Sequence, residues 1–433
     1  MELKQRIIKV RHHQCIRTFF NRISLLILGS FILTTSTLVQ AGSLRIDSWR
    51  IDDQTLWNTR ILPVFHAAHP DIHVTFVGVN PTQYDSTLNA NLSNKTAGDL
   101  ITCRPFASSL RLFQNGHLVD LTNKINLKAY RSITKVAWST QNSKSTYCLP
   151  IAAVTNGFFY DKKIFEELKL NIPESEEQLL TILSSIKRHS KYTPIALGTE
   201  DQWESAQVAL ASIGPNEWKG EIGRRALINQ KVRVTDQQFV RAWEKLAQLK
   251  PYLAPNHQSM NYDEARNLFT SGRAATFLSG SWNAAYLENI DPNRFGVFRY
   301  PASVVGGQCF ITHHMDMGIG INAASTNQED AIVFLQWLTT KEFSEAFANA
   351  TSGFIPLSSH AITINSPLAN DIYQWRKECK STIRINSQYL DNGPQPLENL
   401  LWEVSAGVIN HTLTPREATN IIHKNLEQWF YKN

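Results

Sequence analysis

Three tryptophans stand at the ends of predicted strands or loops, where a side chain can meet a ligand. Trp49 ends the first predicted strand, Trp203 follows residues 198–201, and Trp282 follows residues 279–281. The flat apolar faces of pyranose rings pack on aromatic side chains, and their hydroxyls need polar partners such as carboxylates and amides. Each tryptophan taken alone is more simply explained as core. Together, with acidic residues beside two of them, they favour a sugar-binding mouth.

The local signatures of common enzymes are missing from the chain. It contains no G-x-S-x-G nucleophile elbow, Walker loop, H-E-x-x-H zinc motif or G-x-G-x-x-G dinucleotide fingerprint. His313 and His314, with Asp316 nearby, form the one cluster that suggests a metal site. Adjacent residues of a strand face opposite sides, so only one histidine could enter a given site, and we expect a loop there instead. The sequence predicts no enzyme, no metal site and no cofactor.

Length and charge exclude further classes. The 433 residues, 42% of them hydrophobic, are enough for two or three packed domains and exclude general disorder. Residues 1–41 hold six Lys and Arg against one Glu, which accounts for five of the net +6 charges. The rest of the chain carries about +1, so we expect no nucleic-acid partner.

Residues 1–41 have the three parts of an export signal. A basic stretch ends at Arg22, an apolar stretch covers residues 23–38, and Val39 and Ala41 occupy the −3 and −1 positions of a cleavage site. We expect cleavage after Ala41 and a periplasmic location. An uncleaved anchor remains an alternative, because residues 23–44 are uncharged over a length that can span a bilayer.

Four cysteines follow this leader, at positions 103, 148, 309 and 379. In an oxidising compartment they allow three disulfide pairings, among which the sequence does not choose, and buried free thiols are an equal alternative. They form no C-x-x-C pair, which argues against a zinc site.

Strand and helix patterns alternate after the leader. Residues 44–49 alternate like a strand, residues 54–68 follow as a helix, and residues 72–77 alternate again, which is a β-α-β unit of an α/β domain. A short strand is predicted at 99–103, with helices at 84–92, 108–114, 161–169, 175–189, 203–213, 236–249, 262–271 and 328–339.

Three extended runs predict crossings between domains. Residues 147–160 exceed a usual strand and are long enough to serve two sheets in succession. Residues 317–322 and 353–357 are the second and third runs. Since no low-complexity linker separates the parts, the domains are expected to be interleaved.

Short motifs follow one another in a fixed order over residues 44–431. They are Ile46-Asp47-Ser48-Trp49, residues 65–74, Ala97-Gly98-Asp99, residues 118–122, 147–165, 269–275, Gly280-Ser281-Trp282, 320–325 and 352–357. In order and spacing they resemble the family 1 extracellular solute-binding proteins of bacterial ABC importers, which include maltose-binding and multiple-sugar-binding proteins. Residues 269–275 with Gly280-Ser281-Trp282 are the most specific match, whereas Cys148 and Asp161 replace the usual Gly and Asn of the family.

The resemblance implies an α/β, two-lobed periplasmic binding protein fold (type II) with a multi-strand hinge. The N-terminal lobe is expected at 44–152 and 318–353, the C-terminal lobe at 157–312 and 358–433, and the hinge near 153–156, 313–317 and 354–357. The lobes would close over a ligand that contacts both of them.

The resemblance also implies a function. The protein would capture a mono- or oligosaccharide between the lobes, as a monomer, and deliver it to the permease subunits of an ABC transporter in the inner membrane. The site residues carried over are Trp49, Tyr84, Asp99, Asp201, Trp203, Gly280 and Trp282, with Arg104 as a further candidate. The tryptophans would stack on rings and the aspartates would bind hydroxyls.

Two rival functions remain at this point. A receptor of the same fold could take a polyamine, a glycerol phosphate ester or a metal ion. Acidic residues near the mouth would suit a cation, namely Asp47, Asp52, Asp53, Asp99 and Asp201. A secreted hydrolase with two carboxylates acting as acid and base is the rival from another class, although the order of motifs gives it no support. The sequence names neither the ligand nor the partner permease.

Overall fold

The computed structural model describes residues 42–81, 83–140, 142–387, 389–391 and 393–431. The predicted export signal at 1–41, including its cleavage or retention, lies outside the described residues. Within them, no helix is both long enough and apolar enough to cross a membrane.

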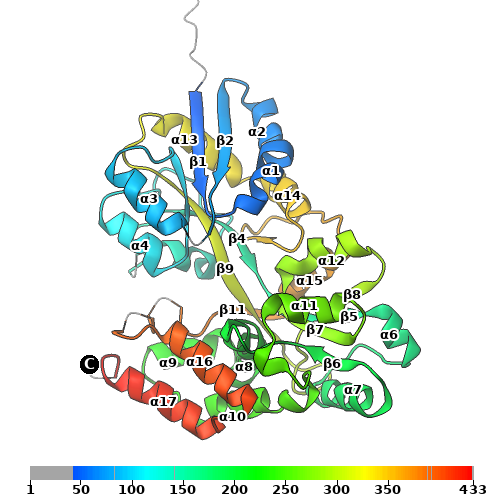
Figure 1. The fold of residues 1–433 in the computed structure, drawn as a ribbon. Helices are drawn as coiled ribbons and strands as arrows, with labels where there is room; N and C mark the ends of the chain where they lie inside the picture. Colours follow the sequence, from blue (N-terminus) through cyan, green and yellow to red (C-terminus); the bar gives the residue numbers. More distant parts are fainter. Residues whose placement is uncertain (1–41, 82, 141, 388, 392, 432–433) are drawn as a thin grey trace, which may run out of the picture. The chain divides into compact units, whose positions relative to one another are not determined.

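The first sheet contains strands from distant parts of the chain. Its order is β10-β4-β9-β3-β1-β2, and β11 pairs with β9 beside this path. The bounds are β1 (Gly42–Ser48), β2 (Ile72–Gly78), β3 (Leu100–Cys103), β4 (Leu149–Val154), β9 (Phe310–Ile321), β10 (Ile355–Pro356) and β11 (Lys380–Ile383). Strand β1 is parallel to β2 and β3, whereas β9 is antiparallel to β3 and β4 (Figure 1). The predicted β-α-β unit is confirmed by the parallel β1–β2 pair.

The second sheet is smaller and has the order β6-β7-β5-β8. Its strands are β5 (Asn156–Asp161), β6 (Thr193–Ala196), β7 (Ala274–Gly280) and β8 (Phe295–Phe298). Strand β5 is antiparallel to both neighbours, and β6 is parallel to β7. With helices packed on both sheets, the α/β class is confirmed.

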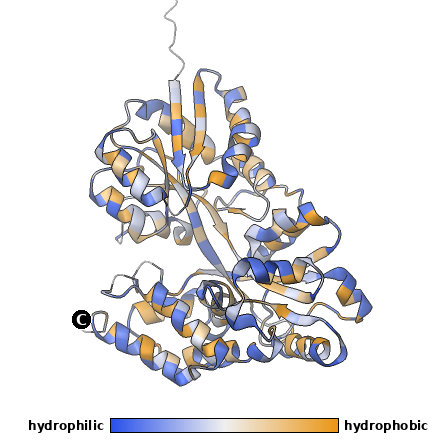
Figure 2. Ribbon diagram, viewed as in Figure 1, coloured by the Kyte–Doolittle hydropathy of each residue, from blue (hydrophilic) through white to orange (hydrophobic). Residues whose placement is uncertain are grey.

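Helices cover each sheet with their apolar faces, as the alternating colours along the helices in Figure 2 indicate. Around the first sheet lie α1 (Gln54–Leu56), the π-helical η2 (Trp57–Ile61), α2 (Leu62–Ala68), α3 (Tyr84–Ser93), α4 (Ala107–Gln114), α5 (Ser132–Lys135), α13 (Gln328–Leu338) and α14 (Lys341–Ala350). Around the second lie α6 (Lys162–Glu167), α7 (Glu176–His189), the π-helical η4 (Ser205–Leu210), α8 (Ala211–Trp218), α9 (Glu221–Ile228), α10 (Gln237–Ala247), α11 (Tyr262–Thr270), α12 (Ala284–Ile290), α15 (Pro367–Glu378), α16 (Leu397–Asn410) and α17 (Pro415–Glu427).

The two sheets have separate hydrophobic cores. In the core of the first sheet, Trp57 is fully buried and stacks on Phe76 with ring centroids 4.9 Å apart. The second sheet packs on both faces: Phe158 belongs to the cluster with α10, α16 and α17, and Phe277 belongs to the cluster with α11, α12 and α15. Two cores of this kind give two packed units that share interleaved chain segments.

Strands β4 and β5 belong to different sheets, yet only Thr155 separates them. The predicted extended run at 147–160 that serves two sheets is therefore confirmed. Because the connection is a single residue, a change in backbone angle at this point reorients everything that follows it.

The segments that pass between the sheets meet at Ser281, just after β7. The Ser281 N–H donates to the carbonyl oxygen of Thr155 at 2.7 Å, and its hydroxyl donates to the carbonyl oxygen of Gly353 at 2.5 Å. The Thr155 hydroxyl in turn donates to the carbonyl oxygen of Thr312 on β9 at 3.0 Å. Gly353 has φ +94°, and an added Cβ would lie 1.9 Å from the Ser281 carbonyl oxygen, so only glycine fits there.

His313 and His314 lie inside strand β9, so the expectation of a loop at this pair is wrong. Strand β9 extends back to Phe310 because β11 pairs with its first four residues in parallel. Nε2 of His313 lies 2.9 Å from the hydroxyl of Ser381 on β11. The partner strand comes about 70 residues later, which a local sequence pattern does not reveal.

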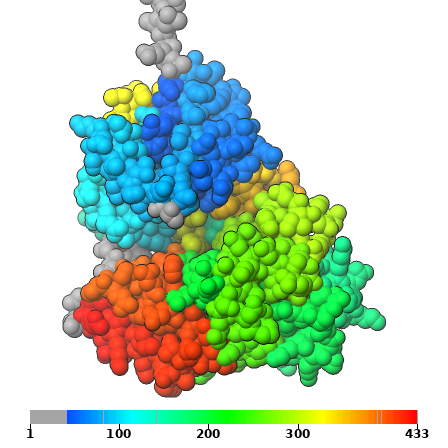
Figure 3. Space-filling view, viewed as in Figure 1, coloured from blue at the N-terminus to red at the C-terminus, as the bar shows by residue number. Residues whose placement is uncertain are grey.

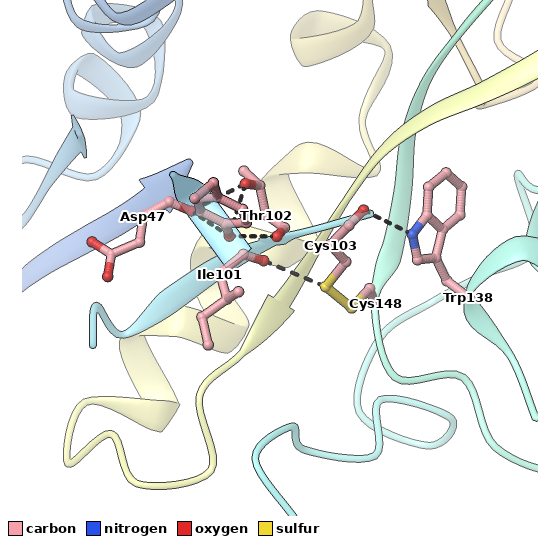
Figure 4. Close-up of a disulfide and its surroundings, with 7 residues drawn as sticks. Asp47, Ile101, Thr102, Cys103, Trp138 and Cys148 are labelled. Atoms are coloured by element: carbon pink, nitrogen blue, oxygen red, sulfur yellow. Dashed lines mark hydrogen bonds between the residues drawn. A yellow bond between two sulfur atoms is a disulfide. The ribbon is translucent and has the colours of Figure 1, made fainter. Parts of the chain in front are cut away.

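Both pairs of cysteines form disulfides. Cys103 at the end of β3 is bonded to Cys148, which precedes β4, and Cys309 before β9 is bonded to Cys379 before β11. Figure 4 shows the first disulfide, with Trp138 donating from Nε1 to the carbonyl oxygen of Cys103 at 3.0 Å. Of the alternatives that the sequence left open, the structure has this one pairing and no free thiol among these four residues.

Candidate ligand-binding site

A cavity of about 510 Å³ lies between residues of the first core and residues packed on the second core. Its volume is typical of small-molecule sites. It is lined by Trp49, Arg104, Pro105, Phe106, Ala107, Ser108, Arg111, Gln207, His314, Met315, Asp316, Arg384, Asn386, Ser387, Asp391, Pro396, Glu398 and Trp402. Figure 3 shows the surface hollowed between the cyan and the orange-to-red segments, and in Figure 1 α4 and α16 face each other across this space.

Trp49 and Arg104 form the wall on the side of the first sheet. The Arg104 guanidinium lies 4.8 Å from the Trp49 ring centroid, and Nε of Arg104 donates to Asp85 at 3.0 Å. Trp49 is only 6% exposed, because Tyr84 packs edge-on against it at 5.4 Å and Arg104 covers its ring. Trp49 therefore offers a ligand a limited part of its ring.

Tyr84 does not line this cavity. Its hydroxyl is buried and donates to the carbonyl oxygen of Thr102 at 2.7 Å, and burial raises the pKa of the hydroxyl. Tyr84, the first residue of α3, instead lines a smaller neighbouring cavity of about 260 Å³.

The strand β9 supplies a polar floor. Nη1 of Arg50 donates to Asp316 at 3.1 Å, and the same guanidinium pairs with Asp53. Burial raises the pKa of Asp316, and the charge of Arg50 opposes this rise. Burial, with the positive charge of Arg384, lowers the pKa of His314 well below its usual value, so its imidazole is neutral at pH 7.

The opposite wall presents carboxylates and amides at the start of α16. Oε1 of Glu398 accepts from Arg384 and from Gln207, each at 2.6 Å. Asp391 accepts the N–H of Glu398 at 2.8 Å, and burial raises the pKa of Asp391. Trp402, one turn further along α16, is half-buried and is therefore more open than Trp49.

Phe106 lines the cavity from a strained backbone position. It precedes α4 with φ +62° and ψ −127°, a conformation that a bulky residue rarely adopts. Its N–H donates to the carbonyl oxygen of Ala137 at 2.7 Å, which fixes the turn. Strain of this kind costs about 1–3 kcal/mol and is concentrated at binding sites.

Trp203 and Trp282 form a second aromatic cluster with Tyr262, outside the lining of the main cavity. The Trp203 ring lies 5.2 Å from Tyr262 and 6.2 Å from Trp282. Nε1 of Trp282 donates to the Tyr262 hydroxyl at 2.6 Å. Both tryptophans are partly exposed.

The remaining predicted residues have structural partners. Gly280 packs under Trp282, where an added Cβ would lie 1.8 Å from the indole ring. Asp201 accepts the N–H of Tyr262 at 2.9 Å. Asp99 accepts the N–H of Arg45 at 3.0 Å and the hydroxyl of Ser325 at 2.7 Å. The structure thus brings Trp49 and Arg104 to the main cavity and places the other predicted residues elsewhere.

Glu204 stands beside the second aromatic cluster in the sequence and is almost entirely buried, with 2% exposed. Neither of its side-chain oxygens has a hydrogen-bond partner within the described residues. Burial, reinforced by the charge of Asp201, raises the pKa of Glu204 to about 8. At neutral pH the side chain is therefore mostly a neutral acid.

Sequence reasoning missed most of the cavity. His314 and Asp316 were singled out only as part of a possible metal cluster. The missed residues with polar or aromatic side chains include Phe106, Arg111, Gln207, Arg384, Asn386, Asp391, Glu398 and Trp402. One signal was available: Leu397, Leu401, Val404 and Val408 follow a helical spacing that places Trp402 at the edge of the core face.

No group of histidine, cysteine, aspartate or glutamate within the described ranges is arranged to hold a metal ion. The cavity instead combines aromatic rings with both hydrogen-bond donors and hydrogen-bond acceptors. That composition suits reversible binding of a polar ligand with flat apolar faces.

Comparisons with known proteins agree with this description. A curated relative, the multiple sugar-binding protein of Streptococcus mutans, is 22% identical over 324 residues, covering 71% of this chain and 74% of that protein. The solved structure of RafE from Streptococcus pneumoniae has a TM-score of 0.71 at 16% identity, covering 90% of this chain and 98% of the other. A chitin oligosaccharide binding protein has a TM-score of 0.69 at 21% identity, covering 89% and 98%.

These structural neighbours are two-lobed solute-binding proteins, so the predicted two-lobed fold is confirmed. The family described as bacterial extracellular solute-binding protein matches residues 51–344, about two thirds of the chain. The protein therefore belongs to the bacterial extracellular solute-binding protein family.

Proposed function

We propose that this protein captures an oligosaccharide in the cavity between its two cores and delivers it to the permease of an ABC importer. The observation that carries the proposal is the lining of that cavity. The half-buried Trp402 offers a ring face, and Gln207, Asn386 and Glu398 around it offer the donors and acceptors that sugar hydroxyls need.

The relatives support a carbohydrate over other solutes. The names of two similar proteins refer to multiple sugars and to chitin oligosaccharides, and another similar protein, RafE, has been solved in complex with raffinose. Two of the three acids that line the cavity are ion-paired, Asp316 with Arg50 and Glu398 with Arg384, and the third, Asp391, accepts the N–H of Glu398. This pairing disfavours the polyamine or metal receptor, which needs free carboxylates.

The mechanism that follows is closure of two lobes about a hinge. The lobes are proposed at 44–152 with 318–353 and at 157–312 with 358–433, and the hinge near 153–156, 313–317 and 354–357. A ligand that contacts both walls of the cavity favours the closed state, and no bond needs to be made or broken. The proposal therefore includes no catalytic step.

The cellular setting is proposed from the sequence. The first 41 residues act as an export signal, and the mature chain works as a monomer in the periplasm with permease subunits in the inner membrane. Membership of an extracellular family supports export of the chain.

A ligand screen tests the function directly. The purified mature chain is heated with neutral and acidic di-, tri- and tetrasaccharides, polyamines, phosphate esters and divalent metal ions. A ligand at about 100 times its Kd adds roughly 2.7 kcal/mol of stability, which raises the melting temperature. We expect a rise with one group of oligosaccharides, and a rise only with polyamines or metals would refute the sugar assignment.

The role of the cavity is tested by substitution. Trp402→Ala removes the open ring and is expected to weaken oligosaccharide binding about tenfold in calorimetry. Trp429→Ala is the control, because this partly buried tryptophan does not line the cavity. Equal affinity of the wild-type protein and the Trp402 variant would place the sugar elsewhere.

A further inference from the structure

The main cavity and the smaller one adjoin along α4. Arg104, Ser108 and Arg111 line both spaces, one of about 510 Å³ and the other of about 260 Å³. The smaller cavity adds the amides of Asn89 and Asn115, both of them exposed. The combined space runs along α4 and exceeds what a single sugar ring requires.

Most arginines around the cavity have a protein counterion. Arg50 pairs with Asp53 and Asp316, and Arg384 pairs with Glu398. These guanidinium groups are neutralised locally and help to position the walls.

Arg104 also has a counterion, but a solvated one. It pairs with Asp85 at 3.0 Å and donates to the carbonyl oxygen of Pro81 at 2.9 Å. The Asp85 side chain is 61% exposed, so Asp85 neutralises Arg104 only weakly.

Arg111 is the exception. It lies on the last turn of α4 with an exposed side chain, and its guanidinium has no ion pair or hydrogen bond in the part of the chain that the structure describes. The charged residues that line the smaller cavity are Asp85, Arg104 and Arg111, one acid against two bases. Arg111 is therefore a positive charge at the junction that no carboxylate of the described residues pairs with, whereas Asp316, Asp391 and Glu398 lie with Arg384 in the rest of the main cavity.

An exposed arginine is ordinary on a protein surface, where water solvates it. Arg111 differs because it borders two adjoining cavities that a ligand is proposed to occupy. When a ligand displaces water there, a group of opposite charge on the ligand gains a guanidinium partner without breaking an existing ion pair. A neutral sugar at the same place leaves that charge unmatched.

Resting on the proposed function, we propose that the ligand is an acidic oligosaccharide whose anionic group, a hexuronate carboxylate or a sulfate ester, binds Arg111 at the junction of the two cavities. The neutral rings of the ligand then lie against Trp402 in the main cavity. The planar guanidinium can pair with two oxygens of a carboxylate or a sulfate at once, which fixes the orientation of the chain.

The test compares matched acidic and neutral ligands. Di- to tetrasaccharides of hexuronic acids are measured by calorimetry beside the same sugars with their carboxyl groups reduced to alcohols. Sulfated oligosaccharides are measured beside their desulfated forms. We expect one acidic series to bind the wild-type protein at least tenfold more tightly than its neutral counterpart, and the series that does so identifies the anion.

Substitution of the arginine then locates the charge. Arg111→Gln is expected to lower the affinity for the acidic ligand about tenfold and to leave that for the neutral counterpart unchanged. Arg60→Gln is the matched control, because Arg60 is also an exposed helical residue that is unpaired within the described residues, but it lines neither cavity. It removes the same charge and should change neither affinity.

The outcomes separate the two proposals. Tight binding of neutral sugars with no preference for acidic forms would overturn the acidic ligand and leave the sugar receptor intact. An equal loss for both forms in Arg111→Gln would also overturn it, because the arginine would then act on the cavity wall. Binding of no sugar, acidic or neutral, would overturn both proposals.

Discussion

Replacing Glu204 with glutamine should make the protein more stable at neutral and alkaline pH. Glu204 is 2% exposed, its oxygens have no partner within the described residues, and its pKa is about 8 against an ordinary value of 4.5. Between these two pH values the folded chain holds a proton that the unfolded chain has released. The stability contributed by the protonated acid is complete below pH 4.5 and is lost as the pH rises through 8.

The size of the effect follows from the width of this window. At 1.36 kcal/mol per pH unit, the wild-type protein loses about 3 kcal/mol between pH 4.5 and pH 7 and about 5 kcal/mol by pH 8 because of this group. Glutamine has a similar shape and does not titrate. The variant should therefore exceed the wild-type protein in stability by an amount that grows with pH across the window.

Urea unfolding at pH 5, 6, 7, 8 and 9, followed by tryptophan fluorescence, measures this difference. Other acids with raised pKa values, including Asp316 and Asp391, remain in both proteins and cancel in the comparison. Glu403→Gln is the matched control, since Glu403 is exposed and unpaired within the described residues, and it should leave the profile unchanged. Parallel profiles for the wild-type protein and Glu204→Gln would refute the buried neutral acid.

Three further predictions concern binding and the crossing segments. Trp282→Ala should abolish measurable ligand affinity if the second aromatic cluster is a subsite, as the family resemblance implies, and calorimetry beside Trp402→Ala decides which cluster dominates. Replacing both Cys309 and Cys379 with alanine should cost about 2–4 kcal/mol in urea unfolding, and an unchanged midpoint would show that the disulfide constrains nothing. Gly353→Ala should destabilise the fold by more than about 1 kcal/mol, because φ is +94° and the Ser281 carbonyl oxygen occupies the space; a stability equal to wild type would contradict this packing.

Local patterns in the sequence predicted the elements that depend on near neighbours. The helix at 54–68 is present over those residues, and the long run at 147–160 does become two strands in two sheets. The structure adds a π-helical turn at Trp57–Ile61, which hydrophobic spacing does not distinguish from an α-helix.

Elements that depend on distant partners were not predictable. The first half of β9 is a strand because β11 lies beside it, and no pattern within residues 310–316 signals that pairing. Dependence on distant partners also explains why only part of the site could be predicted. Trp49 could be proposed from its position at a strand end, and Arg104 from the family resemblance. Arg384 reaches the cavity because it follows β11, and Trp402 because α16 packs on the second core, and neither placement can be read from a local pattern.

The place of β9 in the first sheet determines when that sheet can form. Strand β9 begins more than 150 residues after β4 ends, yet it lies between β4 and β3. During synthesis β3 and β4 leave the ribosome before β9, so the position of β9 between them is still empty. Contacts between residues so far apart in the sequence form slowly. For a chain of an exported family such a delay is useful, because a sheet that lacks its central strand has not yet fixed the chain in its folded form.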